Sequence, residues 1–215
     1  MTAATAQPGR EKIARSFRQF PSRGTAARRL ALCFAALLLI RASAARADYP
    51  EEIPFLPTPI EVVDRMLELA AVTQSDVVYD LGSGDGRIVI RAAKKYGARG
   101  VGIEMDAALI ERAVEAARQQ GVEHLVEFRR EDALKADLAP ASVVTLYMLP
   151  WFNEAVKPSL RKMKPGARVV AHDFGIEGWP PDRTVVLEKP ERMLGGIKHP
   201  HKIFLWKIRK ESSDQ

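Results

Sequence analysis

The sequence of 215 residues contains one cysteine, Cys33. A single cysteine excludes a disulfide within the chain, and its position near the start leaves everything after it without a thiol. The four histidines also lack a cysteine at the spacing of a zinc site. His199 and His201 flank Pro200, and we expect a turn there rather than a pair of metal ligands. The sequence therefore gives no sign of metal or thiol chemistry.

The sequence also lacks, near its start, an apolar run long enough to span a membrane comfortably. The run LALCFAALLLI at 30–40 has eleven residues, whereas a spanning helix needs roughly 20. It follows an arginine-rich segment that ends in Arg28–Arg29, and it precedes RASAARA, in which Ala45 and Ala47 form the A-x-A pattern of a signal-peptidase site. Residues 1–47 are therefore predicted to be a signal peptide or membrane-targeting leader, cleaved after Ala47.

This leader predicts export to the periplasm or anchoring at the inner membrane. The paired arginines resemble a twin-arginine signal, although Ala27 stands where Ser or Thr is usual. Two alternatives remain open. The segment could be a retained membrane anchor, or the start codon could be misassigned, which would make the protein cytoplasmic.

An excess of basic charge is absent from the rest of the chain. The formal net charge is +6, but residues 1–47 alone carry nine basic residues and one acidic residue. From Asp48 onward the chain has 24 basic and 26 acidic residues. This part has no electrostatic reason to seek phosphate backbones, so we expect no nucleic-acid partner.

Strand and helix patterns alternate after a proline-rich approach segment and helix at 48–75. Strands are predicted at 76–81, 99–104, 124–132, 141–149, 167–174, 183–190 and 202–210, and helices at 86–97, 106–121 and 152–164. The last two strands have no helix between them, so they should pair antiparallel at one sheet edge. Residues 76–215 are therefore predicted to be an α/β domain. It is Rossmann-like, with a seven-stranded, mostly parallel sheet, an antiparallel C-terminal edge ribbon and helices on both faces.

The first strand ends in DLGSGDG, where Gly82, Gly84 and Gly86 follow Asp80. Glycines at the carboxyl end of a strand let a ligand approach the backbone closely. The dinucleotide motif G-x-G-x-x-G does not fit, because its third glycine would fall on Arg87. Asp80 would also repel a diphosphate, whereas it would attract an ammonium group. S-adenosylmethionine carries an ammonium group and a sulfonium.

Two further acids follow the next two strands. Glu104 ends the second strand, where a carboxylate can accept hydrogen bonds from both ribose hydroxyls. Asp132 ends the third strand, where it can accept from an adenine amino group. Met105 and Ala133 are candidates to contact the adenine faces, with ordinary core packing as the alternative. Three acids at three successive strand ends point to one shared ligand.

These residues resemble the class I S-adenosylmethionine-dependent methyltransferases, through VVYDLGSGDG, GVGIE, EDA and MKPGARVV. More narrowly, PFLPTPIEVVDRML, VVTLYMLPWFN and HDF resemble bacterial relatives of mitochondrial protein-lysine methyltransferases. That group modifies membrane proteins such as the ATP synthase c-subunit and carries an N-terminal membrane segment. The resemblance implies that the cofactor is S-adenosyl-L-methionine and that its methionine part is held by Asp80, Gly82, Ser83, Gly84 and Gly86. It also implies that the acceptor is a protein lysine.

The acceptor is expected beyond the fourth strand. The sequence there is YMLP, without the Asn or Asp that opens the N-P-P-Y or D-P-P-Y motif of enzymes that methylate base amines. Tyr147 and Asp173 are the candidate catalytic residues, with packing or turn roles as the alternative, and His172 is expected on the face opposite Asp173. The candidate substrate contacts are Thr58 as a lid, Pro150, Trp151 and Trp179. A small-molecule methyltransferase and a non-catalytic cofactor-binding or interaction module remain the rival functions.

Overall fold

The computed structural model describes residues 55–194 and 197–210. The chain divides into two units, Met1–Asp48 and Tyr49–Gln215, and the described residues belong to the second. The predicted leader, with Cys33, lies outside the described residues. None of the described helices has the length and apolar character needed to cross a membrane.

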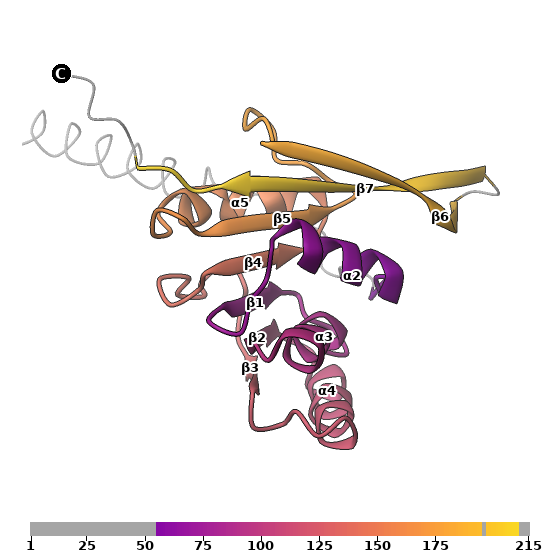
Figure 1. Ribbon diagram of the computed structural model, residues 1–215, viewed down its shortest axis with the longest axis vertical. Helices are drawn as coiled ribbons and strands as arrows, with labels where there is room; N and C mark the ends of the chain where they lie inside the picture. The colour runs from indigo at the N-terminus through magenta and orange to yellow at the C-terminus, as the bar shows by residue number, and fades with distance from the viewer. Residues whose placement is uncertain (1–54, 195–196, 211–215) are drawn as a thin grey trace, which may run out of the picture. The chain divides into compact units, whose positions relative to one another are not determined.

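Seven strands form one sheet in the order β3-β2-β1-β4-β5-β7-β6 (Figure 1). They are β1 (Val77–Leu81), β2 (Arg99–Glu104), β3 (Val126–Arg130), β4 (Val143–Leu146), β5 (Arg168–His172), β6 (Arg183–Leu194) and β7 (Ile197–Lys207). The first five pair in parallel, and β7 pairs antiparallel with both β5 and β6. The predicted mostly parallel sheet with an antiparallel edge ribbon is therefore confirmed.

Helices cover both faces of the sheet, as predicted. They are α2 (Ile60–Leu69), α3 (Arg87–Tyr96), α4 (Ala107–Gln119) and α5 (Pro150–Arg161). One apolar cluster joins α2 and α3 to Val78 of β1, and another joins α5 to Tyr79 and Leu81 of the same strand. Successive side chains of a strand point to opposite faces, so the β-branched run of β1 is buried on both.

The helix ends follow local chemistry. The Asp106 carboxylate caps α4 by accepting from the Ala108 N–H (2.8 Å). Gly97 ends α3 in the left-handed conformation, after two lysines that suit the negative end of the helix dipole. The helix α5 begins at Pro150, two residues earlier than predicted, because proline is well suited to the first helical position.

The prediction of a turn at His199 and His201 is wrong. Both residues lie in β7, which starts five residues earlier than the predicted strand. Pro200 is accommodated because the pairing is irregular there: His201 pairs with Leu187 and His199 with Arg192. A proline lacks an N–H and is tolerated in strands at such bulges. The resulting β6–β7 hairpin extends well past the other strands (Figure 1).

Candidate active site

A cavity of about 850 Å³ opens at the carboxyl ends of β1, β2 and β4. This is the point where the strand order reverses, since β1 lies between β2 and β4, and ligands of open α/β sheets bind at such points. The lining carries six carboxylates and one guanidinium, from Asp80, Asp85, Glu104, Asp106, Glu131, Asp132 and Arg87. The cavity is therefore strongly acidic.

Asp80 is the most deeply buried of these acids, with 3% of its surface exposed. The pKa of its carboxyl is raised to about 7, chiefly by burial; the hydrogen bond from Thr145 opposes this rise, and the nearby Glu104 and Asp85 add to it. In that bond the Thr145 hydroxyl donates to the Asp80 carboxylate (2.7 Å). A bound cation would favour the ionised form of this buried carboxyl, so the site is suited to binding a cation.

The glycine turn gives the cavity its floor. The Gly82 and Ser83 N–H groups both donate to the Ile103 carbonyl (2.9 Å each). A Cβ on Gly82, which has φ +75°, would lie 2.6 Å from the Met148 Sδ, so the close packing of the turn requires glycine. The Ser83 hydroxyl is buried, lines the cavity and has no hydrogen-bond partner among the described residues. It is therefore a polar group in position to bind a ligand.

Glu104 is tied to the turn. One carboxylate oxygen accepts from the Gly84 N–H (2.9 Å), and the other accepts from the N–H groups of Met105 and Asp106 (2.8 and 3.0 Å). A carboxylate has about four acceptor positions. The predicted contact to two ribose hydroxyls would therefore require at least one of these backbone bonds to be exchanged for a ligand bond.

Asp132 follows β3 and accepts from the Leu134 N–H (3.0 Å), while Lys135 lies 3.2 Å from its second oxygen. Ala133 next to it is buried, whereas Met105 across the cavity has 64% of its surface exposed. All three line the cavity, so the structure brings together the residues predicted to surround an adenine.

Most of the predicted site residues line this one cavity: Thr58, Asp80, Gly82, Ser83, Glu104, Met105, Asp132, Ala133, Tyr147 and Trp151. Gly84, Gly86, Pro150, Asp173 and Trp179 are not among its lining residues. Gly84 lies where a Cβ would be 2.3 Å from the Phe55 ring, and Gly86 where a Cβ would be 2.6 Å from the Phe128 ring. These two glycines serve the packing around the turn.

Asp173 lies behind the cavity wall. Its backbone is left-handed (φ +60°), which turns its carboxylate toward His172, so that the His172 Nε2 lies 3.2 Å away. The prediction that the two side chains occupy opposite faces assumed a regular strand and is wrong for this reason. The Asp173 carboxylate also accepts from the Lys202 N–H of β7 (3.0 Å).

Sequence reasoning missed two parts of the site. Thr145, the partner of Asp80, lies on a strand whose pairing with β1 no local pattern reveals. Arg87, in place of the third glycine, donates to Asp85 (2.5 Å) and to the Thr58 carbonyl (2.9 Å). It thereby holds the segment before α2 in place at the cavity. The sequence predicted Thr58 as a lid, but it did not indicate that Arg87 would hold this segment.

Comparison with known proteins agrees with this geometry. Residues 80–183 match the model of the ANTKMT methyltransferase domain. The chain is 43% identical to a protein-lysine N-methyltransferase of Saccharolobus islandicus over 143 residues, which is 66% of this chain and 89% of the relative. A solved structure of a Salinibacter ruber protein named as an RNA methyltransferase, bound to S-adenosyl-L-homocysteine, is 50% identical with a TM-score of 0.67. That match covers 74% of this chain and 98% of the other.

The chain belongs to the class I S-adenosylmethionine-dependent methyltransferases. Another relative is the rat lysine N-methyltransferase of the ATP synthase c-subunit, at 33% identity over 133 residues, which is 61% of each chain. The methyltransferase cavity fits the cofactor of this family. S-adenosylmethionine carries two positive charges and one negative charge, which suits a cavity with six carboxylates, and the Ser83 hydroxyl offers it an unused polar contact.

Proposed function

We propose that this methyltransferase transfers a methyl group to the side-chain amine of a protein lysine. The observation that carries the proposal is the mixed lining of the cavity. Carboxylates line it from the ends of β1 to β3, and the apolar and aromatic side chains of Tyr147, Met148, Trp151 and Phe152 line it from the segment after β4, which we take as the acceptor end. The first suits a cationic donor, and the second suits the long aliphatic stem of lysine. The similarity to a Saccharolobus islandicus protein-lysine N-methyltransferase supports the same acceptor.

The protein's own contribution is to align the acceptor and to exclude water. Bound S-adenosylmethionine supplies an activated methyl group for in-line displacement by the amine nitrogen. A lysine has a free pKa of about 10.4, so it must lose a proton before it can attack. An amine held against this aromatic wall is partly shielded from water, which disfavours the charged ammonium form, and the Tyr147 side chain lies where it can orient the amine.

We further propose that the acceptor is a membrane protein and that the leader at 1–47 brings the enzyme to the membrane. Apolar side chains are exposed around the cavity mouth: Phe55 is 44% exposed, Leu56 58% and Met105 64%. Such a rim suits an apolar partner surface. Relatives are named as lysine methyltransferases of two membrane-protein targets, the ATP synthase c-subunit in rat and the adenine nucleotide translocase in mouse.

The name of the Salinibacter ruber protein makes RNA the second candidate acceptor. Against it, the chain from Asp48 onward has two more acidic than basic residues, and the described cavity lining offers a single guanidinium, which is already bonded to Asp85. A surface that binds RNA tightly needs several cations for the phosphates. We therefore expect transfer to protein.

Transfer of a tritiated methyl group from S-adenosylmethionine into fractionated extracts of the source cell tests the proposal. We expect label in membrane protein that survives nuclease, is released by protease, and appears as methyllysine after acid hydrolysis. The Asp80→Asn enzyme should give none. Label in nuclease-sensitive material would establish RNA as the acceptor, and label in small molecules would establish a metabolite. No label from an enzyme that binds S-adenosylhomocysteine would identify a non-catalytic module.

Localisation has its own test. A C-terminally tagged chain should fractionate with the inner membrane or periplasm. N-terminal sequencing should read from Asp48 if the leader is cleaved after Ala47. A full-length chain in the membrane fraction would mean a retained anchor, and a chain in the cytoplasm would refute the targeting role.

A further inference from the structure

A buried histidine lies directly behind the acceptor end of the cavity. The His172 side chain is fully buried, and its ring centroid lies 4.0 Å from that of Tyr147. Its Nδ1 is 3.4 Å from the Thr58 hydroxyl. Tyr147 and Thr58 both line the cavity. His172 is therefore separated from the acceptor space by one layer of side chains, and one of these carries a hydroxyl that can transmit a proton.

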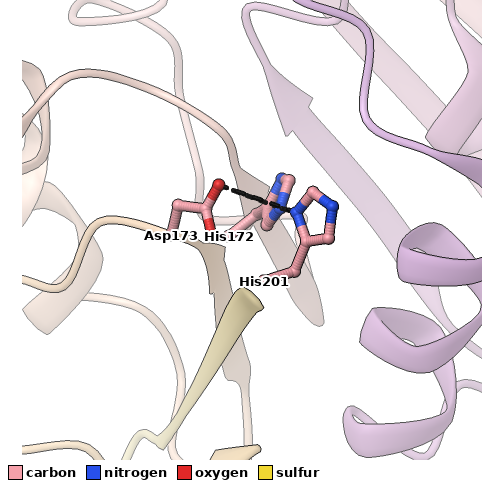
Figure 2. Close-up of side chains that lie close together, drawn as sticks. All are labelled: His172, Asp173 and His201. Atoms are coloured by element: carbon pink, nitrogen blue, oxygen red, sulfur yellow. Dashed lines mark hydrogen bonds and ion pairs between the residues drawn. The ribbon is translucent and has the colours of Figure 1, made fainter. Parts of the chain in front are cut away.

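The other ring nitrogen faces a second histidine and an acid (Figure 2). The His172 Nε2 lies 2.8 Å from the His201 Nδ1 and 3.2 Å from an Asp173 carboxylate oxygen, and that oxygen is 3.8 Å from the His201 Nδ1. His201 is buried, and only 4% of the Asp173 side chain is exposed. The three residues come from β5, its end, and β7, which are adjacent strands.

The distances favour a shared proton over a shared metal ion. In a four-coordinate zinc site with Zn–N of about 2.0–2.1 Å, two ligand nitrogens lie roughly 3.3 Å apart. The nitrogens of His172 and His201 are only 2.8 Å apart, which is the length of an N–H···N hydrogen bond. One of them must therefore donate to the other.

Few other charged groups of the described chain face His172. The residues of α2 that pack against this part of the sheet are apolar, such as Val62 and Met66 in the cluster with Ile203. The α2 carboxylate Asp64 is paired with Arg91 of α3. Near Thr58, the guanidinium of Arg87 is bonded to Asp85. His172 thus contacts His201 and Asp173 on its inner side and Tyr147 on the cavity side.

We propose that Thr58, His172 and His201, with Asp173, form a buried relay that removes the proton from the acceptor ammonium. This rests on the proposed lysine acceptor. The ammonium gives a proton to the Thr58 oxygen as the Thr58 proton passes to the His172 Nδ1. The proton on the His172 Nε2 then moves to the His201 Nδ1, and the Asp173 carboxylate stabilises the resulting imidazolium. The amine nitrogen is left with the lone pair that attacks the methyl group. His172 acts through Thr58, so it is a positioning and relay residue.

The hydrogen bond itself can be tested without any acceptor. In the ¹⁵N-labelled protein, nuclear magnetic resonance should show His172 with its proton on Nε2, and a scalar coupling to the His201 Nδ1. The coupling should vanish in His201→Asn. A metal content of about one ion per chain, lost in His201→Asn, would overturn the relay and make the three residues a metal site. A His172 proton found on Nδ1 would also overturn the relay, because Nδ1 could then not accept the Thr58 proton.

The relay itself is tested by the pH dependence of kcat for methyl transfer to the labelled protein acceptor. His172→Asn and Thr58→Val should lower kcat at pH 7 by about 10²-fold or more, as expected for loss of a proton-transfer group. Both should recover toward the wild-type rate by pH 10, where the amine deprotonates without help. Thr58→Ser keeps the hydroxyl and should restore the rate. His199→Asn, two residues from His201 in β7, is the matched control and should behave as wild type.

The two proposals fail differently. If the wild-type enzyme methylates no lysine, the proposed function is wrong and the relay has no task. If it does methylate lysine but His172→Asn loses the same factor at pH 7 and at pH 10, His172 only supports the wall and the relay is refuted.

Discussion

Cofactor binding should depend steeply on pH below neutrality, because we expect the ionised Asp80 carboxylate to bind the ammonium group of the cofactor. Burial raises the pKa of this carboxyl to about 7 in the free protein, so most copies are neutral at pH 5. An ammonium group binds the ionised form and must displace the proton from the neutral one. S-adenosylhomocysteine is a suitable probe, because its amino group stays protonated between pH 5 and pH 7 (a free α-amino group has a pKa of about 7.7–8.0).

The magnitude follows from the pKa. With a value of about 7, roughly 1% of the Asp80 carboxyls are ionised at pH 5 and half at pH 7. The Kd for S-adenosylhomocysteine should therefore fall about 50-fold over this range, equivalent to about 2 kcal/mol. Near pH 6, binding should release about 0.9 protons per molecule bound, since about nine-tenths of the carboxyls must ionise.

Isothermal titration calorimetry in buffers of different ionisation enthalpy measures both quantities. The control is Asp132→Asn, which removes a less buried cavity acid and should weaken binding while keeping the pH slope. Asp80→Asn should bind weakly at every pH with no proton release. A wild-type Kd that stays constant from pH 5 to pH 7 would mean that Asp80 is ionised without ligand, and the reasoning from burial would be wrong.

Three further predictions concern stability. Asp80→Asn should stabilise the ligand-free protein by up to about 4 kcal/mol above pH 7. The raised pKa of Asp80 in the folded state makes the wild-type protein lose stability as pH rises from about 4 to 7, and asparagine does not ionise. Urea unfolding at pH 8 checks this, and an unchanged midpoint would contradict it. Asp76, whose pKa is lowered to about 2 by bonds to Arg168 and others despite burial, contributes stability that is lost as pH falls from about 4 to 2. Asp76→Asn should therefore cost roughly 1.5–3 kcal/mol at pH 7 and flatten acid unfolding. Gly86→Ala should lower the free energy of unfolding by about 2–4 kcal/mol, because the backbone has φ +75° and the added Cβ would clash with the Phe128 ring. Gly166→Ala has φ +90° but open space around the Cβ, so it should lower the free energy of unfolding by only about 1 kcal/mol. Equal losses in the two variants would rule out the clash.

The sheet could be predicted from sequence because its signals are local. Each strand is a short β-branched run, and each helix has a recognisable end such as Gly97 or Asp106. The acids Asp80, Glu104 and Asp132 could be placed in one cavity because the carboxyl ends of adjacent parallel strands meet at one edge.

The parts that escaped prediction depend on contacts between distant residues. The pairing of His172 with His201 requires the β5–β7 register and the left-handed backbone at Asp173, and neither is written in a local pattern. The extension of β7 over Pro200 required a bulge that is produced by the partner strand β6. The proline between His199 and His201 indicated a turn, and a regular strand at His172 and Asp173 indicated opposite faces for their side chains. Both local signals predicted the wrong geometry.

The strand order also has an evolutionary consequence. Because the chain reverses direction across the sheet after β1 to β3, the cavity is lined by two groups of residues. Those at the ends of β1 to β3 are the ones we expect to bind the methyl donor, and those from β4 onward are the ones we propose to face the acceptor. Mutation of the second group can retarget the enzyme while the first is inherited unchanged. Relatives named for lysine, RNA and rifamycin methylation are what such divided inheritance would produce.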